Sequence, residues 1–215
     1  MSPVLCLISD RRRLGPDWER ALVERVGAAA REGVHLIQVR ERDLEGGDLL
    51  RLVRRCVQAV AGTRARVIVN DRLDVAMASG AHGVHLRADS MPSRRARAVA
   101  PPGFLVGRSV HDAEEARLAG ESGAVDYLIF GHVFDSASKP GLDPAGVRAL
   151  ETAVNATTTP VLAVGGISAA RAEAVAATGA AGLAAIGLFS DPPLSSLSAA
   201  VAAARSAFDR RGGVT

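Results

Sequence analysis

The sequence has several short polar segments, each directly after an apolar run, whose residue types are suited to binding anions. The first spans residues 38–42 and reads Gln-Val-Arg-Glu-Arg, so Gln38 and Arg40 face the same side of an extended chain. Burying polar groups there is unfavourable unless they meet a ligand or each other, and a guanidinium can bind two phosphate oxygens at once. We therefore predict that Arg40 binds an anion, whereas Arg42 is equally consistent with an exposed ion-pair loop.

The segment Asn70-Asp71-Arg72 follows the third apolar run, and its carboxylate has two interpretations. Asp71 could hold Mg²⁺ or orient a substrate, since carboxylate oxygens suit a hard divalent cation. An aspartate directly before a helix also commonly caps that helix by accepting its first backbone N–H groups. On spacing alone, the cap is the better interpretation of Asp71.

The segment around His132 has the highest density of groups that could do chemistry. Gly131-His132-Val133-Phe134 is followed by Ser136, Ser138 and Lys139, which is the only lysine in the chain. Hydroxyl groups and one ammonium in a loop that contains glycine suit a phosphate or a pyrophosphate. We predict a phosphate site there in preference to an ordinary polar loop. The histidines that lie in or beside other apolar runs are interpreted as structural, namely His35, His82 and His85.

The elements that must position these groups alternate regularly along the chain. Apolar runs predict strands at 4–8, 35–39, 67–69, 83–86, 105–109, 127–130, 161–164 and 183–186. Amphipathic stretches predict helices at 17–31, 48–60, 71–79, 93–99, 114–120, 144–153, 169–177 and 195–208. Such alternation without hairpin turns requires parallel strands, and about eight units predict one (β/α)₈ TIM barrel over residues 1–215. An open doubly wound sheet is the alternative, but no G-x-G-x-x-G follows the first strand.

In such a barrel, glycines after the seventh and eighth strands are candidates for binding phosphate. Gly165-Gly166 follows the seventh apolar run and opens a helix, and Gly187 follows the eighth. Backbone N–H groups at these two strand ends commonly hold phosphate in TIM barrels. We predict that Gly165, Gly166 and Gly187 bind a substrate phosphate.

Composition restricts the class of protein further. The net charge is +3, and apolar residues make up 48% but aromatic residues only 3%. Both signs of charge alternate through the predicted helices and no aromatic platform accompanies the arginines, so no nucleic-acid partner is expected. The sequence shows neither a membrane span nor a secretory signal, which predicts a cytoplasmic protein without a membrane partner. Cys6 and Cys56 lie in apolar runs and are expected to be buried free thiols.

Taken together, these motifs resemble the thiamin phosphate synthase/TenI family along nearly the whole chain. The resemblance rests on Gln38-Val39-Arg40-Glu41-Arg42, Asn70-Asp71-Arg72, Gly83-Val84-His85-Leu86, Gly107-Arg108-Ser109-Val110-His111, Gly131-His132-Val133-Phe134 with the serines and lysine that follow, and Gly165-Gly166-Ile167. Synthases of this family join a pyrimidine pyrophosphate to a thiazole phosphate with Mg²⁺ and release pyrophosphate. TenI-type enzymes instead aromatise a thiazole phosphate carboxylate by moving a proton, without a metal.

Two segments make the resemblance closer to TenI. The G-Q-x-D segment of synthases reads Arg87-Ala88-Asp89-Ser90, which displaces the second Mg²⁺ carboxylate by one position, and the segment with His132 is similar to that of TenI. The resemblance therefore implies a thiazole tautomerase, an isomerase without a cofactor, in which His132 moves the proton. It also implies that the thiazole phosphate substrate contacts Gln38, Arg40, Arg42, Asn70, Ser109, Ser136, Ser138, Lys139 and the three glycines.

Two alternatives remain. Gln38 and Asp71 look more like the synthase, which would use Mg²⁺ bound by Asp71. A non-catalytic protein that binds thiazole phosphate on a retained barrel is the second alternative. A homodimer is compatible with each of these.

Overall fold

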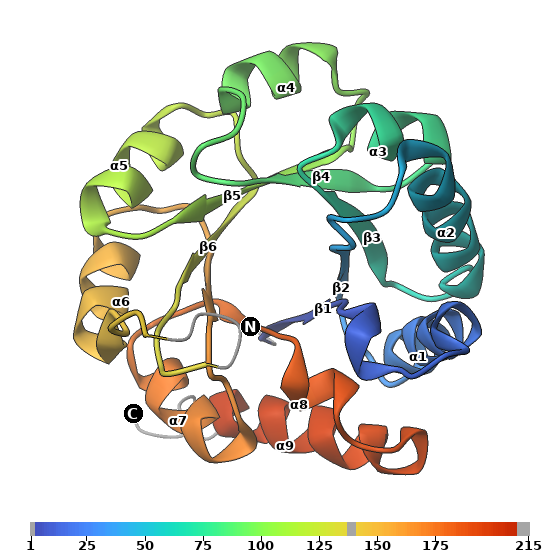
Figure 1. Ribbon diagram of the computed structural model, residues 1–215. Coiled ribbons are helices and arrows are strands. Elements are labelled where there is room, and N and C mark those ends of the chain that lie inside the picture. Colours follow the sequence, from blue (N-terminus) through green and yellow to red (C-terminus); the bar gives the residue numbers. More distant parts are fainter. Residues whose placement is uncertain (1–2, 137–140, 210–215) are drawn as a thin grey trace.

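The computed structural model, which describes residues 3–136 and 141–209, is a barrel of eight parallel strands that are hydrogen-bonded in sequence order and closed by the pairing of the last with the first. Figure 1 views the barrel along its axis and shows the helices as an outer ring around the strands. The (β/α)₈ TIM barrel predicted from the sequence is confirmed. The strands are β1 (Val4–Ile8), β2 (Leu36–Val39), β3 (Arg66–Asn70), β4 (Gly83–Leu86), β5 (Leu105–Val110), β6 (Tyr127–Gly131), β7 (Val161–Val164) and β8 (Gly182–Ala185).

Helices follow the strands and cover the outside of the barrel. Their bounds are α1 (Trp18–Arg31), α2 (Gly46–Ala59), α3 (Leu73–Ser79), α4 (Ser93–Val99), α5 (Ala113–Glu121), α6 (Gly146–Asn155), α7 (Ala169–Ala177), α8 (Gly187–Ser190) and α9 (Leu197–Asp209). Two 3₁₀ turns, η1 (Arg11–Arg13) and η2 (Leu194–Ser196), and the short helix α8 were not predicted from the sequence. They are too short to show a helical period.

Successive residues of most strands pack into two different cores. In β1, Leu5 and Leu7 belong to the large core between the strands and the helices, whereas Cys6 and Ile8 belong to a smaller core inside the barrel. This alternation is the pleat of a strand that is buried on both faces. The inner core is filled by residues from most of the strands, namely Cys6, Ile8, Leu36, Ile68, Tyr127, Ile129, Leu162 and Ala184. The middle of the barrel is therefore filled by side chains rather than open as a channel.

Both cysteines are free and buried, as the sequence predicted. Burial raises the pKa of the Cys6 thiol and of the Cys56 thiol to about 12. At neutral pH both thiols stay protonated and serve as small apolar side chains of the two cores.

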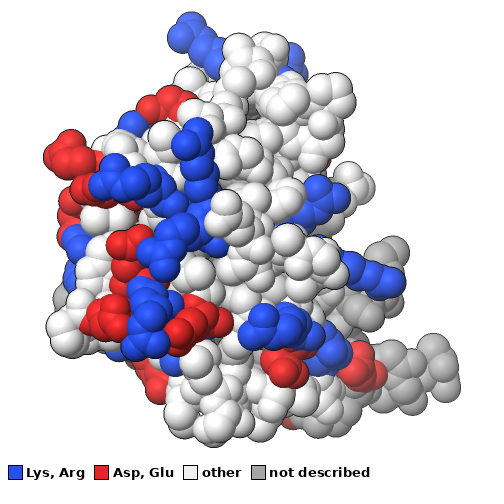
Figure 2. Space-filling view, turned by 90° about the vertical axis from the view of Figure 1, so that its right-hand side faces the viewer, with Lys and Arg blue, Asp and Glu red and all other residues white. Residues whose placement is uncertain are grey.

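Acidic and basic side chains lie next to one another on the surface of α1 and α2. Arg20 pairs with Asp17 and Glu24 along α1, and an arginine of α2, Arg55, pairs with Glu19 of α1. Figure 2 shows this face with blue and red groups interspersed. Among the described residues, no helix is both long and apolar enough to cross a membrane.

The barrel closes where β8 pairs with β1, and this seam has no room for a side chain at Gly182. A Cβ at that position would lie 1.9 Å from the carbonyl oxygen of Val4 and 2.7 Å from its backbone nitrogen. Because these atoms are backbone, β1 itself would have to move to accommodate the methyl group.

Gly182→Ala should therefore lower the free energy of unfolding by about 1–3 kcal/mol or more, the usual effect of overpacking a tight core. Gly47→Ala is the matched control, because its Cβ would approach only the Arg51 side chain, at 3.7 Å. In the first turn of α2 this alanine should be neutral or slightly stabilising. Urea unfolding followed by circular dichroism measures both, and equal midpoints for the two variants would contradict the tight seam.

Candidate functional site

The carboxyl ends of the strands surround a cavity of about 830 Å³. Its volume is within the usual range for sites that bind small molecules, and its position is that of active sites in TIM barrels. It collects residues from β1, β2, β3, β4, β5, β6 and β7, which are far apart in the sequence. Seven of the residues predicted to bind substrate or catalyse line this cavity: Gln38, Arg40, Arg42, Asn70, Ser109, His132 and Gly165.

The other predicted residues lie elsewhere. Gly166, Gly187 and Ser136 are not among the residues that line the cavity. Asp71 lines a neighbouring cavity of about 200 Å³, which shares Asn70 and Arg42 with the large one. Ser138 and Lys139 lie outside the described residues, so their predicted role stays a prediction.

Arg40 and Arg42 give the β2 side of the cavity its positive charge. Within residues 3–136 and 141–209, neither guanidinium forms an ion pair with a carboxylate. Burial first, and then the charge of Arg42, lower the pKa of Arg40 below its usual value. Arginine stays protonated at neutral pH nonetheless, so two cations without a carboxylate partner face the cavity.

The loop after β2 is fixed by a buried carboxylate that takes another partner. Glu41 is 4% exposed and accepts a short hydrogen bond from the Ser9 hydroxyl. It also accepts the backbone N–H of Arg11 at 3.2 Å, and the same Ser9 hydroxyl oxygen accepts the N–H of Arg40 at 2.9 Å. The ion-pair loop that was the other interpretation of Arg42 is therefore not what the structure shows, because Glu41 and Asp43 pair with Arg11 instead. Glu41 and Ser9 thus fix the backbone of the loop after β2, and the Arg40 side chain points into the cavity without a carboxylate partner among the described residues.

Asp71 does not cap the helix that follows it, and the interpretation favoured from spacing is wrong. Its φ angle is 60°, which turns the chain sharply, so that α3 begins only at Leu73 with Arg72 as the residue before it. No side chain caps α3, and Asp71 Oδ1 is buried without a hydrogen-bond partner in the described part of the chain. A non-glycine residue in the left-handed region is uncommon, and aspartate is among the residues that tolerate it best. The turn directs the carboxylate away from the helix.

Arg87 joins the carboxylates of Asp71 and Asp89. Its guanidinium lies 3.7 Å from Asp71 Oδ2 and makes a short ion pair with Asp89. Two carboxylates thus lie around one positive charge at the edge of the cavity, and one of them keeps a buried oxygen without a partner.

These carboxylates fit a Mg²⁺ ion that arrives with a phosphorylated substrate. No group of three or more acidic, histidine or cysteine side chains that could hold a metal occurs among the described residues. Mg²⁺, however, is commonly bound by only one or two carboxylates together with substrate phosphates and water. Asp71 and Asp89 are a donor set of that smaller kind, and Oδ1 of Asp71 has no hydrogen-bond partner among the described residues.

Of the three histidines interpreted as structural, two are satisfied as expected and one belongs to the cavity. His35 Nδ1 accepts the N–H of Leu5 at 3.2 Å, and His82 Nδ1 accepts that of Val67 at 3.0 Å. His85 is only 2% exposed, lies among the residues that line the cavity, and its Nε2 is 2.9 Å from the Ser109 hydroxyl. The sequence did contain a hint of this position, because alternation along Gly83-Val84-His85-Leu86 puts the His85 side chain on the same face of the strand as Gly83, opposite Val84 and Leu86. The strand register was needed to show that this face is the inner one.

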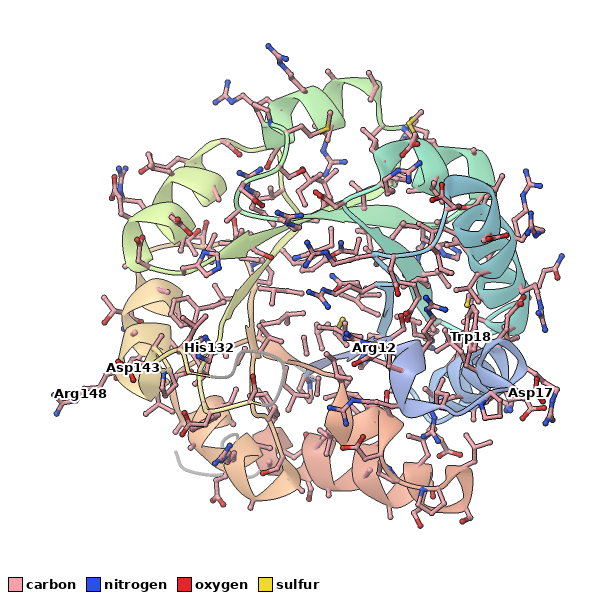
Figure 3. All side chains as sticks on the ribbon, viewed as in Figure 1. Arg12, Asp17, Trp18, His132, Asp143 and Arg148 are labelled. Carbon is pink, nitrogen blue, oxygen red and sulfur yellow. The ribbon has the colours of Figure 1, made fainter. Side chains whose placement is uncertain are left out.

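His132 lies on the opposite side of the opening from Arg12, a residue of η1 that also lines the cavity and was not predicted to do so from the sequence (Figure 3). The Nε2 atom of His132 is 3.1 Å from the carbonyl oxygen of Leu142 in the loop before α6. A Cβ on Gly165 would lie 2.3 Å from the His132 Cβ, so glycine at 165 lets the two loops approach. The hydrogen bond of His132 therefore lies within the loop between β6 and α6, and this loop approaches the loop after β7 at Gly165.

Burial lowers the pKa of His85 to about 3, so the folded protein keeps this ring neutral. The unfolded chain protonates it below a pKa of about 6.5, so the unfolded state binds more protons as pH falls from about 6.5 toward 3. Stability should therefore fall in this window. Between pH 6.5 and pH 5, His85 should contribute a decrease of about 2 kcal/mol in the free energy of unfolding, and His85→Gln should lack it. Chemical unfolding at several pH values tests this, and parallel curves for the two proteins would show that folding does not lower the pKa of His85.

Comparison with known proteins agrees with this site. The family model described as thiamine monophosphate synthase matches residues 5–189. A protein of Chlorobium luteolum named thiamine-phosphate synthase is 37% identical over 86% of this chain and 84% of its own length. One of Methanoculleus marisnigri with the same name is 43% identical over 74% of this chain and 75% of its own length. The structure of thiamine phosphate pyrophosphorylase from Pyrococcus furiosus superposes with a TM-score of 0.81 at 31% identity, covering 96% of both chains.

These names overturn the expectation of a TenI-like thiazole tautomerase, and with it the classification as an isomerase and the proton-transfer role given to His132. The expectation put too much weight on a histidine at a strand end, whose ring in the structure contacts the Leu142 carbonyl. It put too little weight on Gln38 and Asp71, which are the residues that look like the synthase. The match over residues 5–189 and the similarity to synthases over most of the chain show that the protein belongs to the thiamine monophosphate synthase/TenI family.

Proposed function

We propose that this protein is a thiamine-phosphate synthase, a transferase that joins a pyrimidine pyrophosphate to a thiazole phosphate and releases pyrophosphate. The observation that carries the proposal is the pair of guanidinium groups, Arg40 and Arg42, that face the cavity without carboxylate partners among the described residues, beside the uncommitted carboxylate oxygen of Asp71. A strongly anionic substrate and its metal ion match these groups. The names of the relatives support the same activity.

The chemistry explains why such a site needs cations more than it needs a general base. The bond between the pyrimidine methylene carbon and the pyrophosphate oxygen breaks, and the leaving pyrophosphate takes the electron pair. The lone pair of the thiazole nitrogen then forms the new C–N bond, and no proton has to be removed. The transition state therefore develops negative charge on the leaving group. Hydrogen bonds from fixed donors to this group become stronger as the charge develops, and this difference accelerates the reaction.

Arg40 and Arg42 are suited to hold this leaving group. Each guanidinium can donate two hydrogen bonds to phosphate oxygens in a planar arrangement. The backbone of Arg40 is fixed by the Ser9 hydroxyl, so the side chain starts from a defined position. A donor that is already in place needs little reorganisation when the charge develops.

Asp71 and Asp89 would hold Mg²⁺ beside these arginines. When it is bound, Mg²⁺ acts as a Lewis acid that neutralises charge on the pyrophosphate. Arg87, which pairs with both carboxylates, keeps their charges balanced and fixes the direction of the two side chains. The second substrate would place its phosphate near Gly165, which follows β7 and lines the same cavity.

The inner wall of the cavity is apolar where the carbon and nitrogen must meet. Ile8, Ile129 and Ile186 line it from β1, from β6 and from the residue directly after β8. Such a wall offers no hydrogen bonds to water, which would otherwise compete with the thiazole nitrogen for the electron-poor methylene carbon.

Asp71→Asn should reduce formation of thiamine phosphate from both substrates by about 10²-fold, because it removes the charge that would hold Mg²⁺. Asp74→Asn is the matched control, since Asp74 pairs with Arg72 on the surface and does not line the cavity. Product formation measured with and without Mg²⁺ tests both variants. The proposal fails if the wild-type protein forms no product when both substrates and Mg²⁺ are present.

Arg40→Met should weaken binding of inorganic pyrophosphate roughly tenfold to a hundredfold, since hydrogen bonds to a charged group contribute about 1.5–3 kcal/mol. Arg64→Met is the control, because Arg64 is an exposed arginine before β3, at the opposite end of the barrel. Isothermal titration calorimetry measures both affinities. Equal losses in the two variants would mean that net charge alone, and not this site, attracts the anion.

A further inference from the structure

We propose that His85 is a positioning residue that makes the Ser109 hydroxyl a hydrogen-bond donor toward the anionic substrate. In this arrangement Nε2–H of His85 donates to Ser109 Oγ, and the hydrogen of the serine points into the cavity. The inference rests on the proposed function only in the identity of the anion.

One ring nitrogen of His85 forms a hydrogen bond, and the other has no partner. His85 Nε2 lies 2.9 Å from Ser109 Oγ, while His85 Nδ1 is buried and has no hydrogen-bond partner among the described residues. The side chain is 2% exposed, so water has little access to the unpartnered nitrogen. Which nitrogen carries the hydrogen therefore decides which way the bond to Ser109 runs.

The ring carries a single hydrogen, because a second one would put a charge and a further N–H without an acceptor on a side chain that is only 2% exposed. If that hydrogen were on Nδ1, a buried N–H would have no acceptor, which is rare in folded proteins and unfavourable. If it is on Nε2, the nitrogen left without a partner carries a lone pair, and buried acceptors without a partner are less rare than buried donors. The second form is therefore favoured, and it makes His85 the donor to Ser109.

The surroundings hold the ring in this position. His85 pairs in register with Gly107 of β5, and a Cβ at 107 would lie 2.7 Å from His85 Nδ1. The same Cβ would lie 2.2 Å from Tyr127 Cζ, and the rings of His85 and Tyr127 stack with centroids 5.6 Å apart. Glycine at 107 thus makes the space that the two rings fill, two residues before the serine that His85 contacts.

The direction of the hydrogen bond matters for an anion. A hydroxyl that already accepts the His85 N–H can donate its own hydrogen to a phosphate oxygen. In the opposite arrangement the Ser109 hydroxyl would donate its hydrogen to His85 and present only lone pairs to the cavity. These lone pairs would repel an anion. Since Ser109 lines the cavity, the histidine sets whether this wall attracts or repels the substrate.

The tautomer can be measured directly on the wild-type protein. We expect two-dimensional ¹⁵N–¹H NMR of the imidazole groups to show His85 protonated at Nε2 and not at Nδ1, with the signals assigned by their loss in His85→Phe. An Nδ1-protonated ring would overturn the proposal. This readout does not depend on any enzymatic activity.

A double-mutant cycle tests the consequence for binding, with inorganic pyrophosphate as the probe and calorimetry with and without Mg²⁺ as the measurement. His85→Phe, which keeps the stacking on Tyr127, and Ser109→Ala should each weaken binding roughly tenfold to a hundredfold. The double variant should bind no more weakly than Ser109→Ala alone, because His85 acts on the anion only through the Ser109 hydroxyl. His85→Gln, which retains an amide donor, should recover part of the loss.

His82→Phe is the matched control, because His82 directly precedes β4 at the opposite end of the barrel and its side chain bonds only the backbone of Val67 in the described structure. It should leave pyrophosphate affinity unchanged. Additive losses for His85→Phe and Ser109→Ala, or an equal loss for His82→Phe, would contradict a coupling through Ser109. If the cycle behaves as expected but the wild-type protein makes no thiamine phosphate, the proposed function is wrong while this inference stands.

Discussion

The pairing of β8 with β1 is the interaction on which the site depends, because it closes the sheet and brings every strand end to one rim. The seam is held by backbone contacts such as the hydrogen bond from the Val4 N–H to the Ala181 carbonyl at 2.9 Å, and by the close approach at Gly182. Parallel hydrogen bonding leaves no freedom to reverse a strand, so residues that follow β2 and residues that follow β6 must face each other. In an open sheet Arg40 and His132 would lie on distant edges.

Closure also concentrates unsatisfied polar atoms in one place. Five buried side-chain atoms of the described residues have no hydrogen-bond partner, and three of them, in Gln38, Asp71 and His85, belong to residues of the large cavity or of its smaller neighbour. Buried polar groups without partners are unfavourable and are rare away from functional sites. Their gathering here, beside Arg40 and Arg42, which form no ion pair with any described residue, indicates a site that reaches its full hydrogen bonding only with a polar, anionic ligand.

Much of the fold followed from the sequence, because apolar runs and helical periods depend on local chemistry. The predicted bounds of β1, β4, α4, β7 and α7 agree with the structure, and the alternation of Gln38 and Arg40 correctly placed both in the cavity. What could not be predicted depends on contacts between strands. The role of His85 requires its register with Gly107, and Arg12 reaches the cavity from a 3₁₀ turn that has no period.

Two errors have specific physical causes. Spacing before a helix suggested a cap at Asp71, but the left-handed turn at that residue starts α3 two residues later and directs the carboxylate elsewhere. A histidine at a strand end suggested proton transfer, but the His132 ring contacts a loop carbonyl, and the relatives are synthases. In both cases the residue type was compatible with two roles, and only its orientation or its relatives separated them.

The central claim is that the carboxyl-terminal end of the barrel binds a pyrophosphate together with a metal ion. A crystal structure of the protein grown with inorganic pyrophosphate and Mg²⁺ tests it most directly. We expect electron density for the anion in contact with Arg40 and Arg42, with a metal ion bound by Asp71. Density for the anion at the opposite rim, or only on surface arginines outside the cavity, would contradict the claim.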